Sequence, residues 1–132
     1  MSGYLLDTHT LIWFAENDQH LSKTAKSLIE DERNEIYISV CSLFEMTIKM
    51  KIGKLHTQQD ISSFWLHIES YKFTLLPILP HHLEQYLKIP LQEQHRDPFD
   101  RLLIAMAKAE GLSIVTADKQ FELYREIVDI VW

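Results

Sequence analysis

The sequence predicts an α/β fold, a three-layer α/β/α sandwich around a central parallel sheet. Short apolar runs that are typical of strands alternate with longer segments of helical periodicity along the 132 residues. Strands separated by helices imply right-handed crossovers, which make the strands parallel and put helices on both faces. The strands are also apolar at consecutive positions, as in Ile114-Val115 and Ile127-Val128, which is typical of a sheet covered on both sides.

The first half of the chain supplies six of these elements. Strands are expected at 4–7 and 36–40, and helices at about 9–17, 22–32, 42–52 and 60–70. The first strand is a short apolar run whose last residue, Asp7, is charged. Ser22 and Asp60 are expected to be N-caps of the second and fourth helices. Ser42, with Glu45 three residues later, fits a capping box at the start of the third helix.

The second half repeats the alternation. Strands are expected at 73–77, 112–116 and 127–131, and helices at 80–87, 98–110 and 118–124. Pro80 suits the opening of its helix, and Asp97 followed by Pro98 is a good N-cap and first helical residue. Gly53 and Gly111 are expected at the C-terminal ends of the helices that precede them.

Length and composition predict one compact domain over residues 1–132. The chain is 46% hydrophobic with only 3 Gly and 4 Pro, and no linker or repeat is visible. Apolar stretches such as 11–15 are too short to span a bilayer, and Asp7 interrupts the apolar region that a signal peptide would need. The single cysteine, Cys41, has no disulfide partner, which fits a reducing cytoplasm. We therefore expect a cytoplasmic protein without membrane contact.

Four acidic residues lie at element ends from which they could be directed at one point: Asp7, Glu45, Asp100 and Asp118. Open α/β sheets bind ligands at the carboxyl ends of their strands. Two converging charges about 4 Å apart would cost roughly 4 kcal/mol at an effective dielectric near 20, so a cation or a bound proton is needed. An all-oxygen ligand set favours Mg²⁺ or Mn²⁺ over Zn²⁺, and such a cation suits phosphodiester hydrolysis by an activated water.

Four segments together resemble the PIN-domain ribonucleases of the VapC toxin type. They are Leu5-Leu6-Asp7-Thr8, Ser42-Leu43-Phe44-Glu45, Asp97-Pro98-Phe99-Asp100-Arg101-Leu102-Leu103-Ile104-Ala105 and Val115-Thr116-Ala117-Asp118. The resemblance runs from Tyr4 nearly to Trp132. It implies a PIN-like parallel-sheet fold and Mg²⁺- or Mn²⁺-dependent cleavage of RNA by the toxin of a toxin–antitoxin pair. It also implies a homodimer and inhibition by a small cognate antitoxin.

The resemblance also assigns residues to roles. The catalytic and metal-binding quartet consists of Asp7, Glu45, Asp100 and Asp118. We expect the first three to hold one cation, and Asp118 with Thr116 to complete a second site or to order the attacking water. Thr8 and Asp97 are counted as supporting residues. Asp97 is either an N-cap or a further metal ligand, and Pro98 after it favours the N-cap.

Each acid also has a simpler interpretation. A lone Asp at a strand end is usually a turn residue. Glu45 could pair with Lys49 one helical turn on, and Asp100 could serve the helix dipole alone. Among the seven histidines, His95 stands out because it precedes the Asp97–Asp100 segment and could approach a substrate.

The net charge of −6 means that contacts to RNA phosphates would need local positive charge. The candidates are Lys49, Lys51, Lys54, Arg96 and Arg101. The alternative for each lysine is a salt-bridged helix surface.

Two other classes were compatible with the length and the acidic residues. A receiver-type signalling domain needs paired acids after its first strand, whereas Thr8 and His9 follow Asp7 here. A PIN-like protein that binds a partner without catalysis is disfavoured by the complete quartet.

Overall fold

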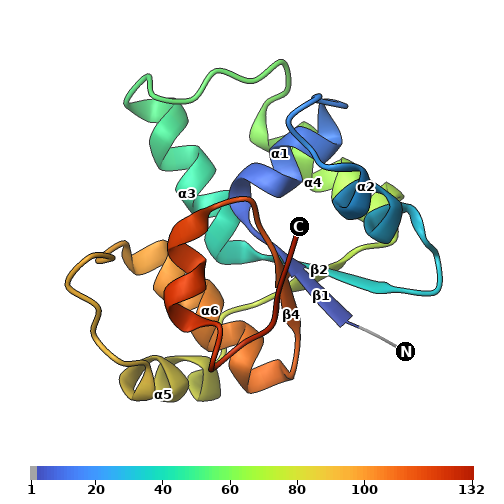
Figure 1. Ribbon diagram of the computed structural model, residues 1–132. Helices are drawn as coiled ribbons and strands as arrows, with labels where there is room; N and C mark the ends of the chain where they lie inside the picture. The colour runs from blue at the N-terminus through green and yellow to red at the C-terminus, as the bar shows by residue number, and fades with distance from the viewer. Residues whose placement is uncertain (1–2) are drawn as a thin grey trace.

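A five-stranded parallel sheet forms the centre of the molecule (Figure 1). The computed structural model describes residues 3–132. The strand order is β3-β2-β1-β4-β5, so the first strand lies in the middle. The strands are β1 (Gly3–Leu6), β2 (Glu35–Ser39), β3 (Thr74–Leu76), β4 (Ser113–Val115) and β5 (Ile130–Val131). Every neighbouring pair is parallel, as the sequence predicts.

The register brings the carboxyl ends of the central strands together. Leu6 of β1 lies opposite Val115 of β4. The next residue, Asp7, donates its backbone N–H to the Val115 carbonyl at 3.2 Å, and Thr116 follows on the neighbouring strand. On the other side of β1, β2 ends at Ser39, where the next helix begins. The residues that directly follow β1, β2 and β4 therefore lie at the same edge of the sheet, which we call the carboxyl edge.

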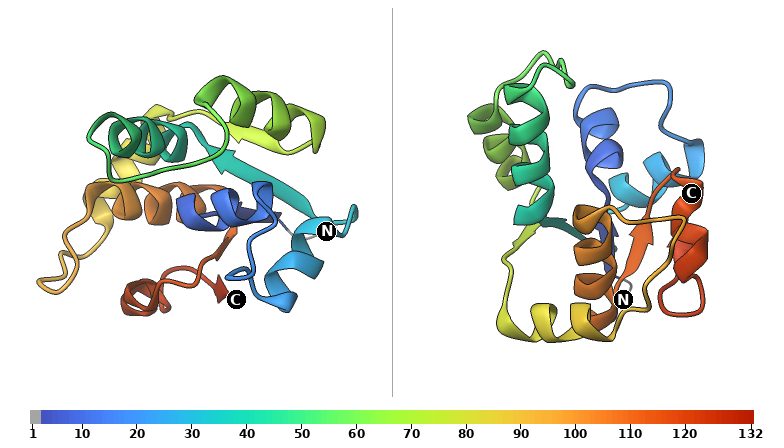
Figure 2. Two further views of the ribbon diagram at one scale, coloured as in Figure 1. Left: turned by 90° about the horizontal axis from the view of Figure 1, so that it is seen from above. Right: turned by 90° about the vertical axis from the view of Figure 1, so that its left-hand side faces the viewer.

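Helices cover both faces of the sheet (Figure 2). They are α1 (Thr8–Ala15), α2 (Lys23–Glu30), α3 (Val40–Lys51), α4 (Ile61–Ser70), α5 (Pro80–Lys88), α6 (Pro98–Glu110) and a 3₁₀ helix, η1 (Lys119–Tyr124). One apolar cluster packs α1 to α4 on one face, and a second packs α5, α6 and η1 on the other. Leu5 belongs to the second and Leu6 to the first, as alternation along a strand requires. The predicted α/β/α sandwich is confirmed. No helix within residues 3–132 is both long and apolar enough to cross a membrane.

Most helix ends lie where the sequence predicts them. The side chains of Ser22 and Asp60 each accept a hydrogen bond from the backbone N–H three residues on. Pro80 is the first residue of α5. Gly111 ends α6 with φ of 69°, in the left-handed region that glycine adopts without strain.

The predicted start of α3 is wrong by two residues. The N-cap is Ser39, whose hydroxyl accepts from the Cys41 N–H at 3.0 Å, and the helix begins at Val40. Ser42 therefore lies inside the first turn, where its buried hydroxyl has no partner among the described residues. The capping box of Ser42 and Glu45 does not form, and Glu45 moves one turn deeper into the helix.

The C-terminal segment also differs from its prediction. Residues 119–124 form a 3₁₀ helix, and the backbone N–H groups of Ile127 and Val128 both donate to the Tyr124 carbonyl. Because of this turn, the last strand begins three residues later than predicted, and β5 contains only Ile130 and Val131.

Candidate metal centre

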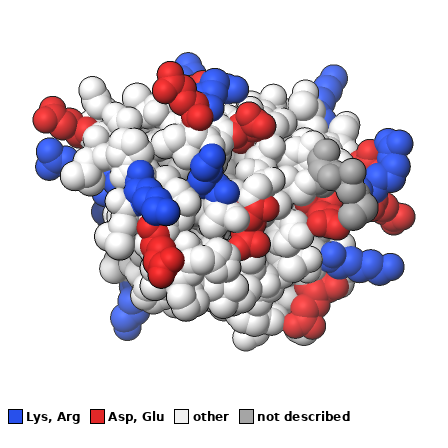
Figure 3. Space-filling view, turned by 90° about the horizontal axis from the view of Figure 1, so that it is seen from below, with Lys and Arg blue, Asp and Glu red and all other residues white. Residues whose placement is uncertain are grey.

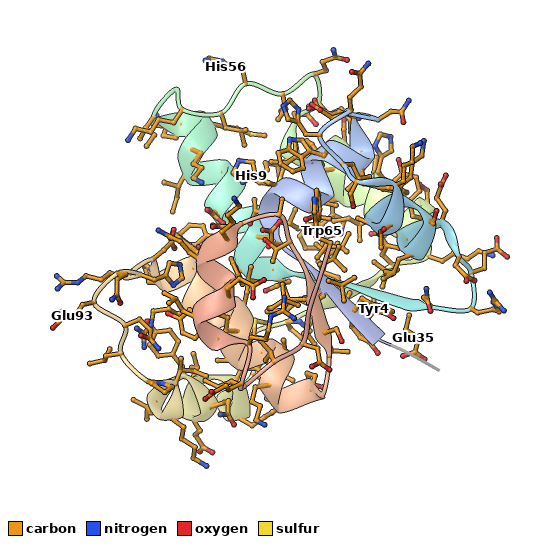
Figure 4. The ribbon with its side chains drawn as sticks, viewed as in Figure 1. Tyr4, His9, Glu35, His56, Trp65 and Glu93 are labelled. Carbon is orange, nitrogen blue, oxygen red and sulfur yellow. The ribbon has the colours of Figure 1, made fainter. Side chains whose placement is uncertain are left out.

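Asp7 lies at the carboxyl end of β1 and is the N-cap of α1. Its Oδ1 accepts hydrogen bonds from the backbone N–H of Thr10 at 2.8 Å and from the Thr10 hydroxyl at 2.9 Å, and its Oδ2 accepts from the Thr116 hydroxyl. Burial raises the pKa of Asp7, while the bonds from Thr116 and Thr10, and then His9 (labelled on α1 in Figure 4), favour its charged form. The net shift of the Asp7 pKa is upward. The hydrogen bonds and the charge of His9 therefore do not fully compensate the cost of burying a charged Asp7.

Glu45 lies in α3 and is 5% exposed. Its Oε1 accepts from the Thr8 hydroxyl at 2.6 Å, which ties the start of α1 to α3. Its Oε2 forms an ion pair with Lys49 Nζ at 2.8 Å, one helical turn on. The pairing of Glu45 with Lys49 that the sequence left open is therefore present, in addition to the contact with Thr8.

Asp100 is in the first turn of α6, and its side chain is 16% exposed. Its Oδ2 lies 3.0 Å from Nε2 of His95. Burial raises the pKa of Asp100 to about 7; the hydrogen bond with His95 opposes the rise, and the charges of Asp97 and Glu45 add to it. Asp100 therefore lies within electrostatic range of two other carboxylates.

Asp97 is the N-cap of α6, as the sequence predicts. Its Oδ1 accepts from the backbone N–H groups of Phe99 at 2.8 Å and Asp100 at 3.2 Å. This cap holds the first turn of α6, and with it the backbone from which Asp100 extends.

Asp118 lies at the same edge but at the surface. It is exposed, and its Oδ1 caps η1 by accepting from the Gln120 N–H at 2.9 Å. Its own N–H donates to the Thr116 hydroxyl at 3.0 Å, so Thr116 links Asp118 to Asp7. We call Asp7, Glu45, Asp97, Asp100 and Asp118 the acidic cluster.

The acidic cluster is open rather than closely packed. Within residues 3–132, no three of its side chains bring one oxygen each within 4.8 Å of one another. Mg²⁺ is usually bound through one or two carboxylates and keeps several waters, so a wide spacing is compatible with it.

A second group of possible ligands lies at the other end of α6, where His81, His82 and Glu110 bring their ligand atoms within 4.8 Å. Nδ1 of His82 accepts the Leu79 N–H at 3.0 Å, so Nε2 carries the proton and donates to Glu110 Oε2 at 2.8 Å. A metal would need the lone pair of Nε2, so His82 serves instead as a clamp between α5 and α6. The bonds from His81 and His82 lower the pKa of Glu110.

The sequence profile of the PIN domain matches residues 4–127. The chain belongs to the PIN domain family. A relative of this PIN domain is the ribonuclease VapC22 of Mycobacterium tuberculosis, which is 27% identical over 125 residues that cover 95% of this chain and 94% of the relative. The family predicted from the four sequence segments is confirmed.

Solved structures share the whole fold of this PIN domain. One is VapBC2 from Rickettsia felis bound to a DNA fragment from its promoter, with a TM-score of 0.67, 17% identity and coverage of 98% of this chain and 97% of that chain. Another is a toxin–antitoxin complex from Klebsiella pneumoniae, with a TM-score of 0.64, 18% identity and coverage of 98% and 96%. At these identities the likeness establishes the fold.

The electrostatics of this PIN domain fit a hard divalent cation at the carboxyl edge. Burial raises the pKa of the Cys41 thiol to about 12, and the charges of Glu45, Asp100 and Asp97 contribute to the rise. The pKa of Lys49 is also raised: burial lowers it, but the bond and charge of Glu45 together with the charges of Asp97 and Asp100 outweigh burial. Negative potential and an all-oxygen donor set are what Mg²⁺ or Mn²⁺ requires.

The basic residues expected to contact RNA differ in accessibility. Arg101 is 4% exposed, donates to the Ile89 carbonyl at 3.3 Å and lies 5.4 Å from the centre of the Tyr86 ring. Its inclusion among surface RNA contacts is corrected, because its guanidinium packs α6 against the end of α5. Lys51, Lys54 and Arg96 are exposed, and Lys49 is paired with Glu45.

Sequence reasoning missed two side chains, Thr10, which bonds to Asp7, and Tyr124, which bonds to His95. Thr10 could have been found, because an Asp N-cap accepts from the backbone N–H two or three positions on, which here is that of Thr10. Tyr124 carries no local signal, since it reaches the cluster only through His95, 29 positions away. The structure buries His95 against Asp100 rather than exposing it to a substrate.

Proposed function

We propose that this chain is a divalent-cation-dependent endoribonuclease and the toxin of a toxin–antitoxin pair. The observation that supports this most directly is the group of three carboxylates at the carboxyl edge, those of Asp7, Glu45 and Asp100, each bonded to a side chain from another segment. The relationship to a ribonuclease supports RNA as the substrate. Hydrolysis of a phosphodiester is the chemistry that such a centre suits.

The proposed ligands of Mg²⁺ or Mn²⁺ are Asp7, Glu45 and Asp100. Asp118 and Thr116 complete a second position or order the attacking water. When bound, the cation activates water and neutralises the charge that develops on the leaving oxygen.

The surrounding side chains orient these carboxylates. Hydroxyl groups of Thr8 and Thr116 each use their one proton on a carboxylate oxygen, which keeps the remaining lone pairs of that oxygen available. Lys49 compensates part of the charge of Glu45, and because its side chain is 34% exposed it can also approach a phosphate of the substrate. Asp97 acts as the cap that fixes the first turn of α6.

Positive charge for RNA lies on two projecting segments. Lys51 and Lys54 are at the end of α3 and in the loop that also carries His56, at the top of Figure 4. Arg96 is in the loop between α5 and α6, which carries Glu93 at the left of that view. On the face seen from below, positive and negative side chains are interspersed (Figure 3), without a continuous basic surface. We propose that Lys51, Lys54 and Arg96 contact RNA phosphates.

An inhibitory partner and a second copy of the chain belong to the same proposal. The structurally similar toxin–antitoxin complex supports a small cognate antitoxin as the partner of this chain. We propose a homodimer that is inhibited when the antitoxin binds.

The test is a comparison of wild type with Asp7→Asn. Both proteins are incubated with cellular RNA and Mg²⁺ or Mn²⁺, and the 5′ ends of the products are sequenced. We expect discrete cuts with the wild type and none with Asp7→Asn, because the amide removes a charged ligand. Asp129→Asn, at an exposed position, is the control that should cut as the wild type does. Cleavage by folded Asp7→Asn, or no cleavage by the wild type with either cation, would contradict the proposal.

A further inference from the structure

A buried chain of hydrogen bonds joins Asp100 to the C-terminal 3₁₀ helix. His95 is 2% exposed, and its Nε2 lies 3.0 Å from Asp100 Oδ2. Its Nδ1 lies 2.8 Å from the hydroxyl of Tyr124, a fully buried residue of η1. The imidazole also packs against the rings of Tyr124 and Phe121, with centroids 5.4 and 6.1 Å away. Both ring nitrogens and the ring itself are therefore fixed.

The chemistry of the three groups sets the direction of the hydrogen bonds. A carboxylate that binds a cation is ionised and can only accept, so Nε2–H of His95 donates to Asp100. Nδ1 of the neutral imidazole then carries the lone pair, which accepts the O–H of Tyr124. The Tyr124 hydroxyl can thus donate to Nδ1 and stabilise the tautomer that presents N–H to Asp100.

This arrangement engages only one oxygen of the carboxylate. Within residues 3–132, Asp100 Oδ2 has His95 as its partner, and Oδ1 accepts no hydrogen bond. Donation to Oδ2 restricts rotation of the carboxylate, while the cap from Asp97 fixes the backbone at the same residue. The position of Oδ1, which accepts no hydrogen bond from the described residues, is therefore fixed by the contacts of Oδ2 and of the backbone.

We propose that His95 and Tyr124 are positioning residues, which hold the Asp100 carboxylate so that Oδ1 stays free to bind a divalent cation. The proposal rests on the nuclease centre proposed above, and it adds two residues that do not touch the cation. Groups that orient a metal ligand commonly contribute 10–100-fold to metal affinity or activity.

The chain supplies a matched control at the other end of α6. His82 is also fully buried, and its Nε2 likewise donates to a carboxylate, that of Glu110 at 2.8 Å. Replacing His82 removes an equivalent buried bond without changing the environment of Asp100. Any loss of metal affinity caused by destabilisation alone should therefore occur in both variants.

The test measures Mn²⁺ affinity without RNA, by calorimetry or by the electron paramagnetic resonance of free Mn²⁺. The proteins are wild type, Asp100→Asn, His95→Leu, His95→Gln, Tyr124→Phe and His82→Leu. We expect His95→Leu to bind Mn²⁺ about 10–100-fold more weakly. His95→Gln should recover most of the affinity, because its amide N–H can reach a similar position. Tyr124→Phe should give a smaller loss, and His82→Leu none.

Kinetics give a second readout. With RNA as substrate, His95→Leu should lower kcat at saturating Mn²⁺ while leaving KM for RNA unchanged, because His95 contacts the ligand of the cation and not the substrate. Wild-type affinity in His95→Leu, equal losses in His95→Leu and His82→Leu, or no recovery in His95→Gln would overturn the positioning role alone. Absence of Mn²⁺ binding by the wild type, or no effect of Asp100→Asn, would overturn the metal centre and the positioning role with it.

Discussion

Neutral donors hold the three central carboxylates of the acidic cluster. The hydroxyl of Thr116 bonds to Asp7, the hydroxyl of Thr8 to Glu45, and the imidazole of His95 to Asp100. A neutral donor orients a carboxylate without cancelling its charge, so the negative potential that attracts a cation is kept. Lys49 is the exception, and its ammonium lies at the rim of the site.

In the metal-free protein, the negative charge of Asp100 lowers the stability of the fold. The pH dependence of stability should reveal this effect. Burial, together with the nearby Asp97 and Glu45, raises the pKa of Asp100 to about 7, above its usual value near 3.8. Between about pH 4 and pH 7 the folded protein keeps a proton that the unfolded chain has released. The stability that this proton confers is fully present below about pH 4 and is lost as the pH rises through 7.

Asp100→Asn should therefore be more stable than the wild type at pH 8 in the presence of a chelator. The expected difference is on the order of 2 kcal/mol, and it should shrink as the pH falls toward 4. Denaturant unfolding at several pH values measures it. A difference that does not change with pH would show that repulsion and burial at Asp100 do not govern the effect.

The helix starts at the carboxyl edge are made by members of the acidic cluster. Asp7 is the N-cap of α1, Asp97 of α6 and Asp118 of η1. An acidic N-cap satisfies free backbone N–H groups and interacts favourably with the helix dipole. The same acids therefore begin helices and contribute negative charge at one edge of the sheet.

Substitutions of Asp97 can separate its role as a helix cap from the effect of its negative charge. Asp97→Ala removes the acceptor for two N–H groups and should cost about 1 kcal/mol of stability. Asp97→Ser keeps a cap without the charge and should retain both stability and RNA cleavage. Chemical unfolding and cleavage rates are measured on the two variants. Loss of cleavage in a stable Asp97→Ser protein would instead make Asp97 a participant in the metal centre.

Local signals made most elements predictable. The apolar runs, Ser22, Asp60 and Gly111 each determine structure through neighbours a few residues away, and their predictions are confirmed. The start of α3 was mistaken because Ser39 and Ser42 can both cap a helix, and the local pattern does not decide between them. The contact of His95 with Tyr124 joins segments 29 positions apart, so no local pattern indicates it.

The protein is acidic as a whole, whereas its proposed substrate, RNA, is a polyanion. The net charge is −6, and the face seen from below shows interspersed charges of both signs (Figure 3). In the proposed function, attraction for RNA depends on a few exposed basic residues, and counterion release makes their contribution sensitive to salt.

Replacement of Lys51 and Lys54 together by Ser should weaken RNA binding and flatten its dependence on salt. Each phosphate contact to a single strand contributes roughly 0.7 to the slope of log K against log salt, so a loss of about 1.4 is expected. Affinity for an RNA carrying the cleavage site is measured with inactive Asp7→Asn protein at several salt concentrations. Lys23 and Lys26 of α2, replaced in the same way, are the control. An unchanged slope in the Lys51 and Lys54 variant would exclude them from the RNA-binding surface.

The strand order bears on the synthesis of this protein. β1 is made first, yet its neighbours are β2 and β4. Asp7 is bonded by Thr116, and the His95 that bonds Asp100 is itself bonded by Tyr124. A chain that has been made only as far as α5 therefore has Asp7 and Glu45 but neither β4 nor Asp100. A ribosome that translates this chain can therefore carry the proposed metal centre only after α6, β4 and Thr116 have emerged and packed against β1.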